Sequence, residues 1–125
     1  MAQLFGKFRG TVTDVFDPLD QARVQVDVPS AGITASWAVP CFPLGGDVAI
    51  AGLPLMGDTV WVEFEEGDPE RPIWTGSPTP PTSGPLVPGD ILLLAGKVRL
   101  ATSSGGEVVV DGPTVSINNG AVEVF

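Results

Sequence analysis

The sequence contains no histidine, one cysteine and only two methionines in 125 residues. Without histidine, the chain lacks the commonest general base and the commonest metal ligand of proteins. A lone Cys41 allows neither an intrachain disulfide nor a zinc site built on thiolates. Because Val39, Pro40 and Phe42 surround it with apolar side chains, we expect Cys41 to be a small buried residue.

Positive charge is scarce as well. Six basic residues stand against fifteen acidic ones, so the formal net charge is −9. An anionic surface repels phosphate backbones and anionic lipid, which argues against nucleic-acid binding and electrostatic membrane docking. No stretch approaches the roughly 18 apolar residues of a transmembrane helix, and the N-terminus lacks the apolar centre of a signal peptide. We therefore expect neither a membrane span nor a secretion signal.

Glycine and proline are abundant, with 16 and 13 residues, and helical periodicity never extends beyond two turns. These features predict an all-β protein of short strands and turns. The clearest strand covers residues 60–64, where Val60, Val62 and Phe64 alternate with polar or aromatic residues. A turn at 67–69 follows, and Pro72 begins the return strand, because proline cannot donate to a ladder. This segment is predicted to be a β-hairpin with an acidic tip.

Three further strands are predicted upstream. The first covers residues 6–16 and contains Gly10, which we interpret as a bend or bulge. The second covers 23–28, and the third covers 37–43, where prolines favour a sheet edge. Residues 44–58 are interpreted as an apolar flap over one barrel mouth. Five strands within residues 1–76 predict an OB-type barrel, with a core of Val24, Val26, Val28, Val60, Val62 and Phe64.

Residues 77–90 form a proline-rich segment, which predicts an extended, semi-rigid spacer. Beyond it, segments 107–113, 114–120 and 121–125 align at a period of seven. Helices do not tolerate Gly-Pro and Asn-Gly at such short intervals, which argues against a coiled coil, so short strands joined by tight turns are the alternative. Two repeat positions are aliphatic: Val108, Val115 and Val122 share one, and Val110, Ile117 and Val124 share the other. Residues 91–125 are therefore predicted to form a short intertwined trimeric β-helix or β-prism needle, because one chain cannot bury these rows alone.

Two groups of side chains could carry chemistry. The carboxylates of Glu63, Glu65, Glu66, Asp68 and Glu70 could serve a glycosidase or a calcium site. A hairpin tip offers no pocket that raises a pKa, and the spacing differs from a calcium loop, so we interpret them as a solvated turn. The aromatic residues Trp37, Trp61, Trp74, Phe42 and Phe64 could form a stacking platform, but they lack a basic groove, which favours core or subunit packing. We expect no catalytic residue, cofactor or metal site.

Several motifs occur in a characteristic order along residues 4–76. They are Gly6–Asp14, Asp17-Pro18-Leu19, Arg23–Pro29, Trp37–Cys41, Pro54–Phe64 and Gly67–Gly76. Together they resemble the OB domain of the contractile-tail spike family, which includes phage baseplate assembly protein V, the VgrG proteins of type VI secretion and the spikes of extracellular injection particles.

The resemblance implies a homotrimeric, non-enzymatic central spike that docks to a baseplate hub protein. It also implies a PAAR-repeat tip protein as a candidate partner near Phe125, and purely mechanical contact with the target membrane. The expected location is a virion tail baseplate or an extracellular injection particle, assembled in the bacterial cytoplasm. Larger relatives carry a fused hub region or a lysozyme domain, so we expect these functions in other polypeptides. Two alternatives stay open: a monomeric OB module that binds oligosaccharide or single-stranded nucleic acid, and a wall-lytic enzyme that uses carboxylates of 63–70.

Overall fold

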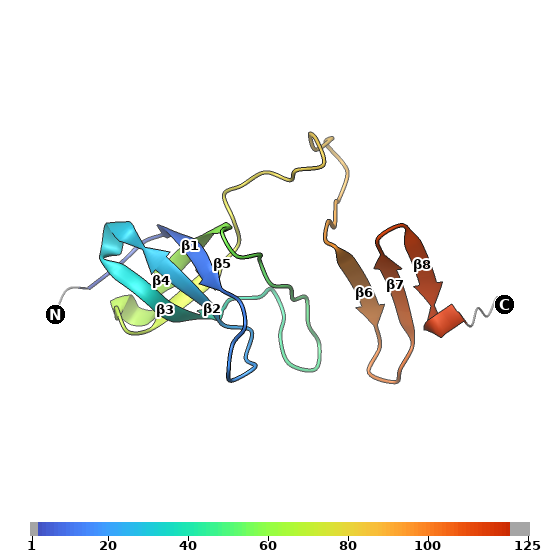
Figure 1. Cartoon of the computed structure of the whole chain (residues 1–125), viewed down its shortest axis with the longest axis horizontal. Coiled ribbons are helices and arrows are strands. Elements are labelled where there is room, and N and C mark those ends of the chain that lie inside the picture. Colours follow the sequence, from blue (N-terminus) through green and yellow to red (C-terminus); the bar gives the residue numbers. More distant parts are fainter. Residues whose placement is uncertain (1–2, 121–125) are drawn as a thin grey trace. The chain divides into compact units, whose positions relative to one another are not determined.

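The computed structural model describes residues 3–120 (Figure 1). The chain divides into two compact units, with the boundary between Pro80 and Pro81. This boundary falls within the predicted spacer. Among the described residues, no helix has the length and apolar character needed to cross a membrane.

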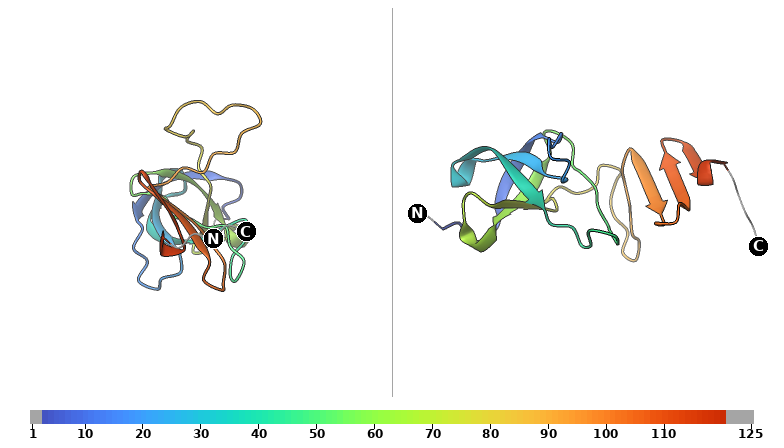
Figure 2. Two further views of the ribbon diagram at one scale, coloured as in Figure 1. Left: turned by 90° about the vertical axis from the view of Figure 1, so that its right-hand side faces the viewer. Right: turned by 90° about the horizontal axis from the view of Figure 1, so that it is seen from below.

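The first unit is a closed five-stranded barrel, visible from two further directions in Figure 2. Its strands are β1 (Phe8–Asp14), β2 (Val24–Val28), β3 (Ile33–Pro40), β4 (Thr59–Phe64) and β5 (Pro72–Thr75). They pair in the order β1-β2-β3-β5-β4, and the ring closes between β4 and β1. Only β3 and β5 run parallel. Short 3-10 turns, η1 (Pro29–Ala31) and η2 (Glu65–Gly67), connect β2 to β3 and β4 to β5. The all-β prediction and the OB-type barrel are confirmed.

Alternation along the strands builds the barrel core. In β2 and β4 every second side chain points inward, which buries Val24, Val26, Val28, Val60, Val62 and Phe64. Val12, Ala38 and Trp74 complete the buried cluster. Valine is well suited to these positions, because its branched side chain packs on a pleated surface with little loss of rotamer freedom.

The third strand differs from the prediction. It begins at Ile33 instead of residue 37, ends at Pro40, and pairs with both β2 and β5. The prediction of an edge strand was therefore wrong, because closure of the barrel leaves no edge and Pro40 stands only at the strand's end. Residues 33–36 join the strand through a bulge between Val26 and Val28, where the Ala35 N–H donates to Asp27 Oδ1 at 2.8 Å.

Gly10 was interpreted as a bend or bulge, and the alternative of a bulge was wrong. Pairing of β1 with β4 continues through Gly10 without a shift, and the irregularity in β1 lies between Val12 and Asp14. Glycine is favoured at this position by close approach of the neighbouring strand β4: a Cβ on Gly10 would lie 2.7 Å from Val62 Cγ2. The residue therefore allows the barrel wall to pack tightly at this point.

Segment 41–58 connects β3 to β4 and does not cover the barrel core. Its one regular feature is an isolated bridge between Leu44 and Ile50. Phe42 is half-buried and packs against the buried cluster, whereas the other large apolar side chains of the segment are exposed. The interpretation of 44–58 as a closing flap was therefore wrong, and Cys41, expected to be buried, is exposed.

The second unit is a three-stranded antiparallel sheet in the order β6-β7-β8. Its strands are β6 (Lys97–Ala101), β7 (Glu107–Asp111) and β8 (Thr114–Ile117), and a 3-10 turn, η3 (Asn118–Gly120), follows. The predicted repeats 107–113 and 114–120 thus each supply one strand and one turn. The third repeat, with Val122 and Val124, lies outside the described residues.

Candidate functional site

The sheet of the second unit has one entirely aliphatic face. Between β6 and β7, Val98 lies opposite Val110 and Leu100 lies opposite Val108. Between β7 and β8, Val110 lies opposite Val115 and Val108 lies opposite Ile117. Residues that lie directly opposite each other in an antiparallel pair share a face. We call this surface the aliphatic face; it consists of Val98, Leu100, Val108, Val110, Val115 and Ile117.

Most of the aliphatic face is exposed in the single chain. Val115 is 64% exposed and Leu100 is 61% exposed. Val110 and Ile117 are also exposed, whereas Val98 and Val108 are half-buried. An isolated sheet of three strands needs a packed face to be stable in water. The aliphatic face is therefore the strongest candidate interaction surface of this unit.

The opposite face of the same sheet is polar. It carries an ion pair between Arg99 Nε and Glu107 Oε1, and the backbone N–H of Glu107 donates to Asn118 Oδ1 at 2.8 Å. A shallow, open hollow lies here, lined by Lys97, Arg99, Glu107, Val109, Asp111, Thr114, Ser116 and Asn119. Exposed ion pairs contribute at most about 1 kcal/mol, so this pair adds little to the stability of the sheet.

Four of the six residues predicted for the needle core lie on the aliphatic face: Val108, Val110, Val115 and Ile117. The sequence reasoning missed Val98 and Leu100, because segment 97–100 is out of phase with the period of seven. Their alternation with Lys97 and Arg99 was the signal that could have found them. Two antiparallel strands need only place their apolar residues on the same face, and the number of residues between the strands can vary. The pairing of β6 with β7 therefore tolerates a longer turn than the repeat of seven residues allows.

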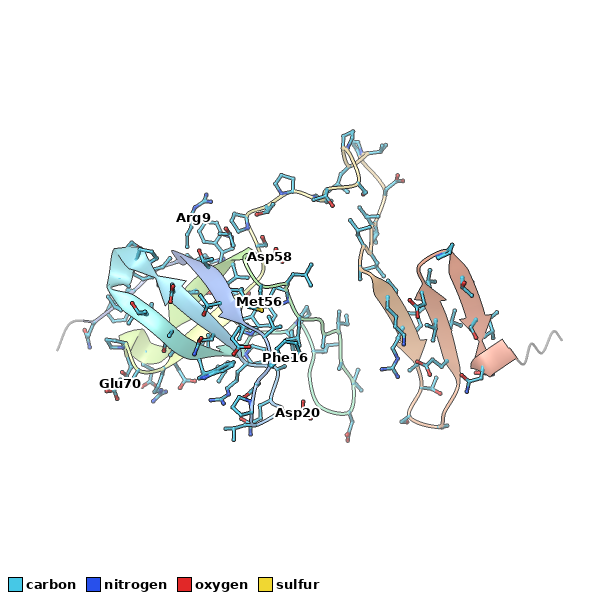
Figure 3. All side chains as sticks on the ribbon, viewed as in Figure 1. Arg9, Phe16, Asp20, Met56, Asp58 and Glu70 are labelled. Atoms are coloured by element: carbon cyan, nitrogen blue, oxygen red, sulfur yellow. The ribbon has the colours of Figure 1, made fainter. Side chains whose placement is uncertain are left out.

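The predicted carboxylate cluster surrounds η2 at one end of the barrel. Glu65 forms an ion pair with Arg71, and Asp68 Oδ1 accepts the backbone N–H of Glu70 at 2.9 Å. Glu65, Glu66 and Glu70 are exposed (Figure 3 labels Glu70). Among residues 3–120, no three metal-ligating side chains gather at one place. The geometry is that of a solvated turn closed by its own hydrogen bonds.

The aromatic residues separate into two groups. Trp74 and Phe64 are buried in the barrel core, and Phe42 meets Trp74 edge to face at 5.6 Å between ring centroids. Trp37 and Trp61 lie on the barrel exterior, and each ring is covered by an arginine. Arg23 lies 5.4 Å from the Trp37 ring, and Arg9 lies 5.0 Å from the Trp61 ring. Because these faces already carry cation–π contacts, they do not form an open stacking platform.

Asp17 closes the loop between β1 and β2, a role that the sequence reasoning did not assign. Its carboxylate accepts hydrogen bonds from Nε and Nη2 of Arg23, and from the backbone N–H groups of Leu19, Gln21 and Arg23. Its side chain is only 3% exposed. The Arg23 guanidinium, helped by the backbone donors, holds the pKa of Asp17 well below its usual range. The turn sequence Asp17-Pro18-Leu19 was the available signal.

A closed five-stranded barrel filled by valines is consistent with an OB-type domain. A family model described as the type VI secretion system/phage-baseplate injector OB domain matches residues 8–78, more than half of the chain. The chain belongs to this family, which confirms the resemblance found in the motifs. The family is structural and is not known for enzymatic activity. Membership in it indicates a structural role in a phage baseplate or a related injection machine. A comparison with curated proteins gave no match.

Proposed function

We propose that the chain is the central spike of a contractile injection machine and acts as a homotrimer. The barrel of residues 1–76 docks to a baseplate hub protein, residues 77–90 form a spacer, and residues 91–125 form the needle. The spike belongs to a phage tail baseplate or an extracellular injection particle and is assembled in the bacterial cytoplasm.

The observation that carries this proposal is the exposed aliphatic face. Val115 and Leu100 are more than half exposed in one chain, which costs stability unless a partner covers them. Three such sheets facing a common axis bury all of these side chains and leave the polar faces outside. Homo-oligomers prefer closed rotational symmetry, which favours a trimer over an open fibre. Pairing of β7 with β8 within one chain supports a prism of three sheets.

The proposed mechanism is mechanical. A stiff, narrow trimer concentrates the force of sheath contraction on a small area of the target envelope, so contact with the membrane needs no electrostatic attraction. This agrees with the net charge of −9. A PAAR-repeat tip protein is the proposed partner at the C-terminal end. No catalytic step is assigned to the chain.

Co-expression of tagged and untagged chains tests the trimer. Native mass spectrometry should find four species, with zero, one, two and three tags, because three copies combine at random. Three species would indicate a dimer, and two would indicate a monomer; either result would contradict the proposal. Titration of tryptophan fluorescence with chitooligosaccharides and oligonucleotides tests the alternative of a monomeric binding module, and we expect no change.

A further inference from the structure

One end of the barrel is strongly apolar. The antiparallel pairing brings the β1–β2 loop, the β3–β4 segment and the end of β5 to the same end of the barrel. Backbone hydrogen bonds between Val12 and residues 57–58 join the two connections at their base. Except for Phe5 and Val39, all exposed large apolar side chains of residues 3–80 lie on these connections. We call them the loop-end surface: Phe16, Leu19, Leu44, Val48, Ile50, Leu53, Leu55 and Met56.

These connections hold their apolar side chains outward on an ordered backbone. The Asp17–Arg23 ion pair closes the first one, and Asp58 Oδ2 accepts the Leu55 N–H at 2.9 Å in the second. Leu55 is nevertheless 74% exposed, and Phe16 is 79% exposed. Figure 3 shows Phe16 and Met56 at this end of the barrel and Glu70 at the other. A concentrated apolar surface of this kind marks a protein interface.

Charge decides which end of the barrel can meet identical copies. The opposite end places Glu65, Glu66, Asp68 and Glu70 within six residues, and Arg71 forms an ion pair with Glu65. Three such turns at one axis would bring carboxylates together, which like-charge repulsion disfavours. At the loop end, Asp17 and Asp58 are engaged within their own loops, and Asp20 and Asp47 remain as exposed charges among many apolar residues. Apolar residues in the centre with a few charges at the rim are the usual composition of an interface.

Chain connectivity points to the same end. The spacer leaves the barrel after Thr75, beside the β4 strand start, where Trp61 N–H donates to Gly76 O at 3.3 Å. If three chains are joined through their needles, each proline-rich spacer tethers its barrel to the assembly from the loop end. Such tethering raises the effective concentration of the barrels to about the millimolar range. A weak apolar contact then suffices to bring the barrels together.

We propose that the loop-end surface is a contact between copies of this chain, in which the three barrels of the spike meet through their loop ends. The proposal rests on the trimeric function proposed above and adds a second interface to it. The occupant of each loop-end surface is the same surface of the neighbouring copies, and the acidic turn at η2 points away from them.

Single cysteines in the full chain test this arrangement. In a Cys41→Ser background, Leu55→Cys places a thiol on the loop-end surface, and Glu70→Cys, also exposed, is the matched control at the opposite end. Both are labelled with pyrene maleimide, and light scattering gives the mass of each. We expect trimers in both cases, with excimer emission from Leu55→Cys only. Alkylation of the unlabelled Leu55→Cys thiol should be about tenfold slower in the trimer than in a chain made monomeric by Val115→Asp.

The outcomes separate the two proposals. A trimer whose Leu55→Cys thiol gives no excimer and reacts as fast as in the monomer overturns the loop-end contact and leaves the trimeric spike standing. Excimer emission from Glu70→Cys of equal strength overturns it as well, because the barrels would then meet through the acidic end. A monomeric mass for both variants overturns the spike and the contact together.

Discussion

The barrel and the β6–β8 sheet use the same kind of strand but treat their aliphatic side chains in opposite ways. Val26 and Val62 are completely buried in the barrel, whereas Val115 in the sheet is 64% exposed. Alternation, valine content and turn chemistry are similar in both. The difference is closure: five strands bend into a ring that encloses its own inner face, and three strands do not.

This difference separates two sources of stability within one chain. The barrel has a core of its own and needs no partner to hide it. The sheet exposes its aliphatic face, so its stability depends on a partner that covers this face. Substitutions in the barrel should therefore change the free energy of unfolding, and substitutions on the aliphatic face should change the oligomeric state.

A charge on the aliphatic face should have the largest effect. Val115→Asp would bring three carboxylates into one apolar interior, at a cost on the order of several kcal/mol for each. We expect complete loss of the trimer and an intact barrel, measured by light scattering and circular dichroism. Ser116→Asp, on the polar face of the same strand and opposite Val109, is the control and should leave the trimer unchanged. Trimers in both variants would show that the face is not an interface.

Truncation of the barrel core should produce the opposite pattern. Val62 is fully buried, and Val62→Ala should lower the free energy of unfolding of the barrel by about 2–3 kcal/mol, because it leaves a cavity. The trimer mass should not change. Val39→Ala, at a site that is 45% exposed, should cost clearly less. Urea titration followed by tryptophan fluorescence measures both, and equal losses would contradict the assigned core.

Adding one methyl group at Gly10 should destabilise the barrel where β1 packs against Val62. Gly10→Ala places a Cβ 2.7 Å from Val62 Cγ2, and overpacking of this kind costs about 1–3 kcal/mol. Gly45→Ala, where a Cβ meets nothing within 4 Å, is the control. In a double-mutant cycle, Val62→Ala should relieve part of the Gly10→Ala loss, because it removes the crowded methyl groups. Strict additivity would mean that the two residues do not touch.

The Asp17–Arg23 ion pair should give a smaller effect that depends on pH. The folded state holds the pKa of Asp17 below the ordinary value, so its stabilisation is present at neutral pH and is lost as the pH falls below about 4. Asp17→Asn should lower the melting temperature at pH 7 and reduce the decline between pH 5 and pH 2. The exposed Asp47→Asn serves as the control. Parallel pH profiles for wild type and Asp17→Asn would exclude this role.

Local pattern was enough to predict most of the barrel. Alternation at 24–28 and 60–64 located two core strands, and the turn residues before Pro72 located the hairpin. The errors concern contacts between distant segments. Whether β3 is an edge depends on its pairing with β5. The need for glycine at position 10 depends on Val62 of the neighbouring strand β4. The exposure of Leu55 and Cys41 was missed because the sequence of a loop does not distinguish apolar residues that pack on the chain's own core from apolar residues that are exposed.

The repeat of seven residues predicted the strands β7 and β8, but it did not identify every residue of the aliphatic face. A period of seven identified Val108, Val110, Val115 and Ile117, but it excluded Val98 and Leu100, which join through cross-strand register instead. The Asp17–Arg23 ion pair was also missed, because two residues six positions apart in a loop give no periodic signal in the sequence.

Light scattering of the intact chain at micromolar concentration, combined with binding of an apolar dye, tests the central claim that identical copies cover the aliphatic face. The account predicts a mass three times the 12.9 kDa of one chain, with little dye bound until Val115→Asp releases the monomers. A stable species of 12.9 kDa that binds no dye would contradict it, because one chain would then hide these side chains by itself.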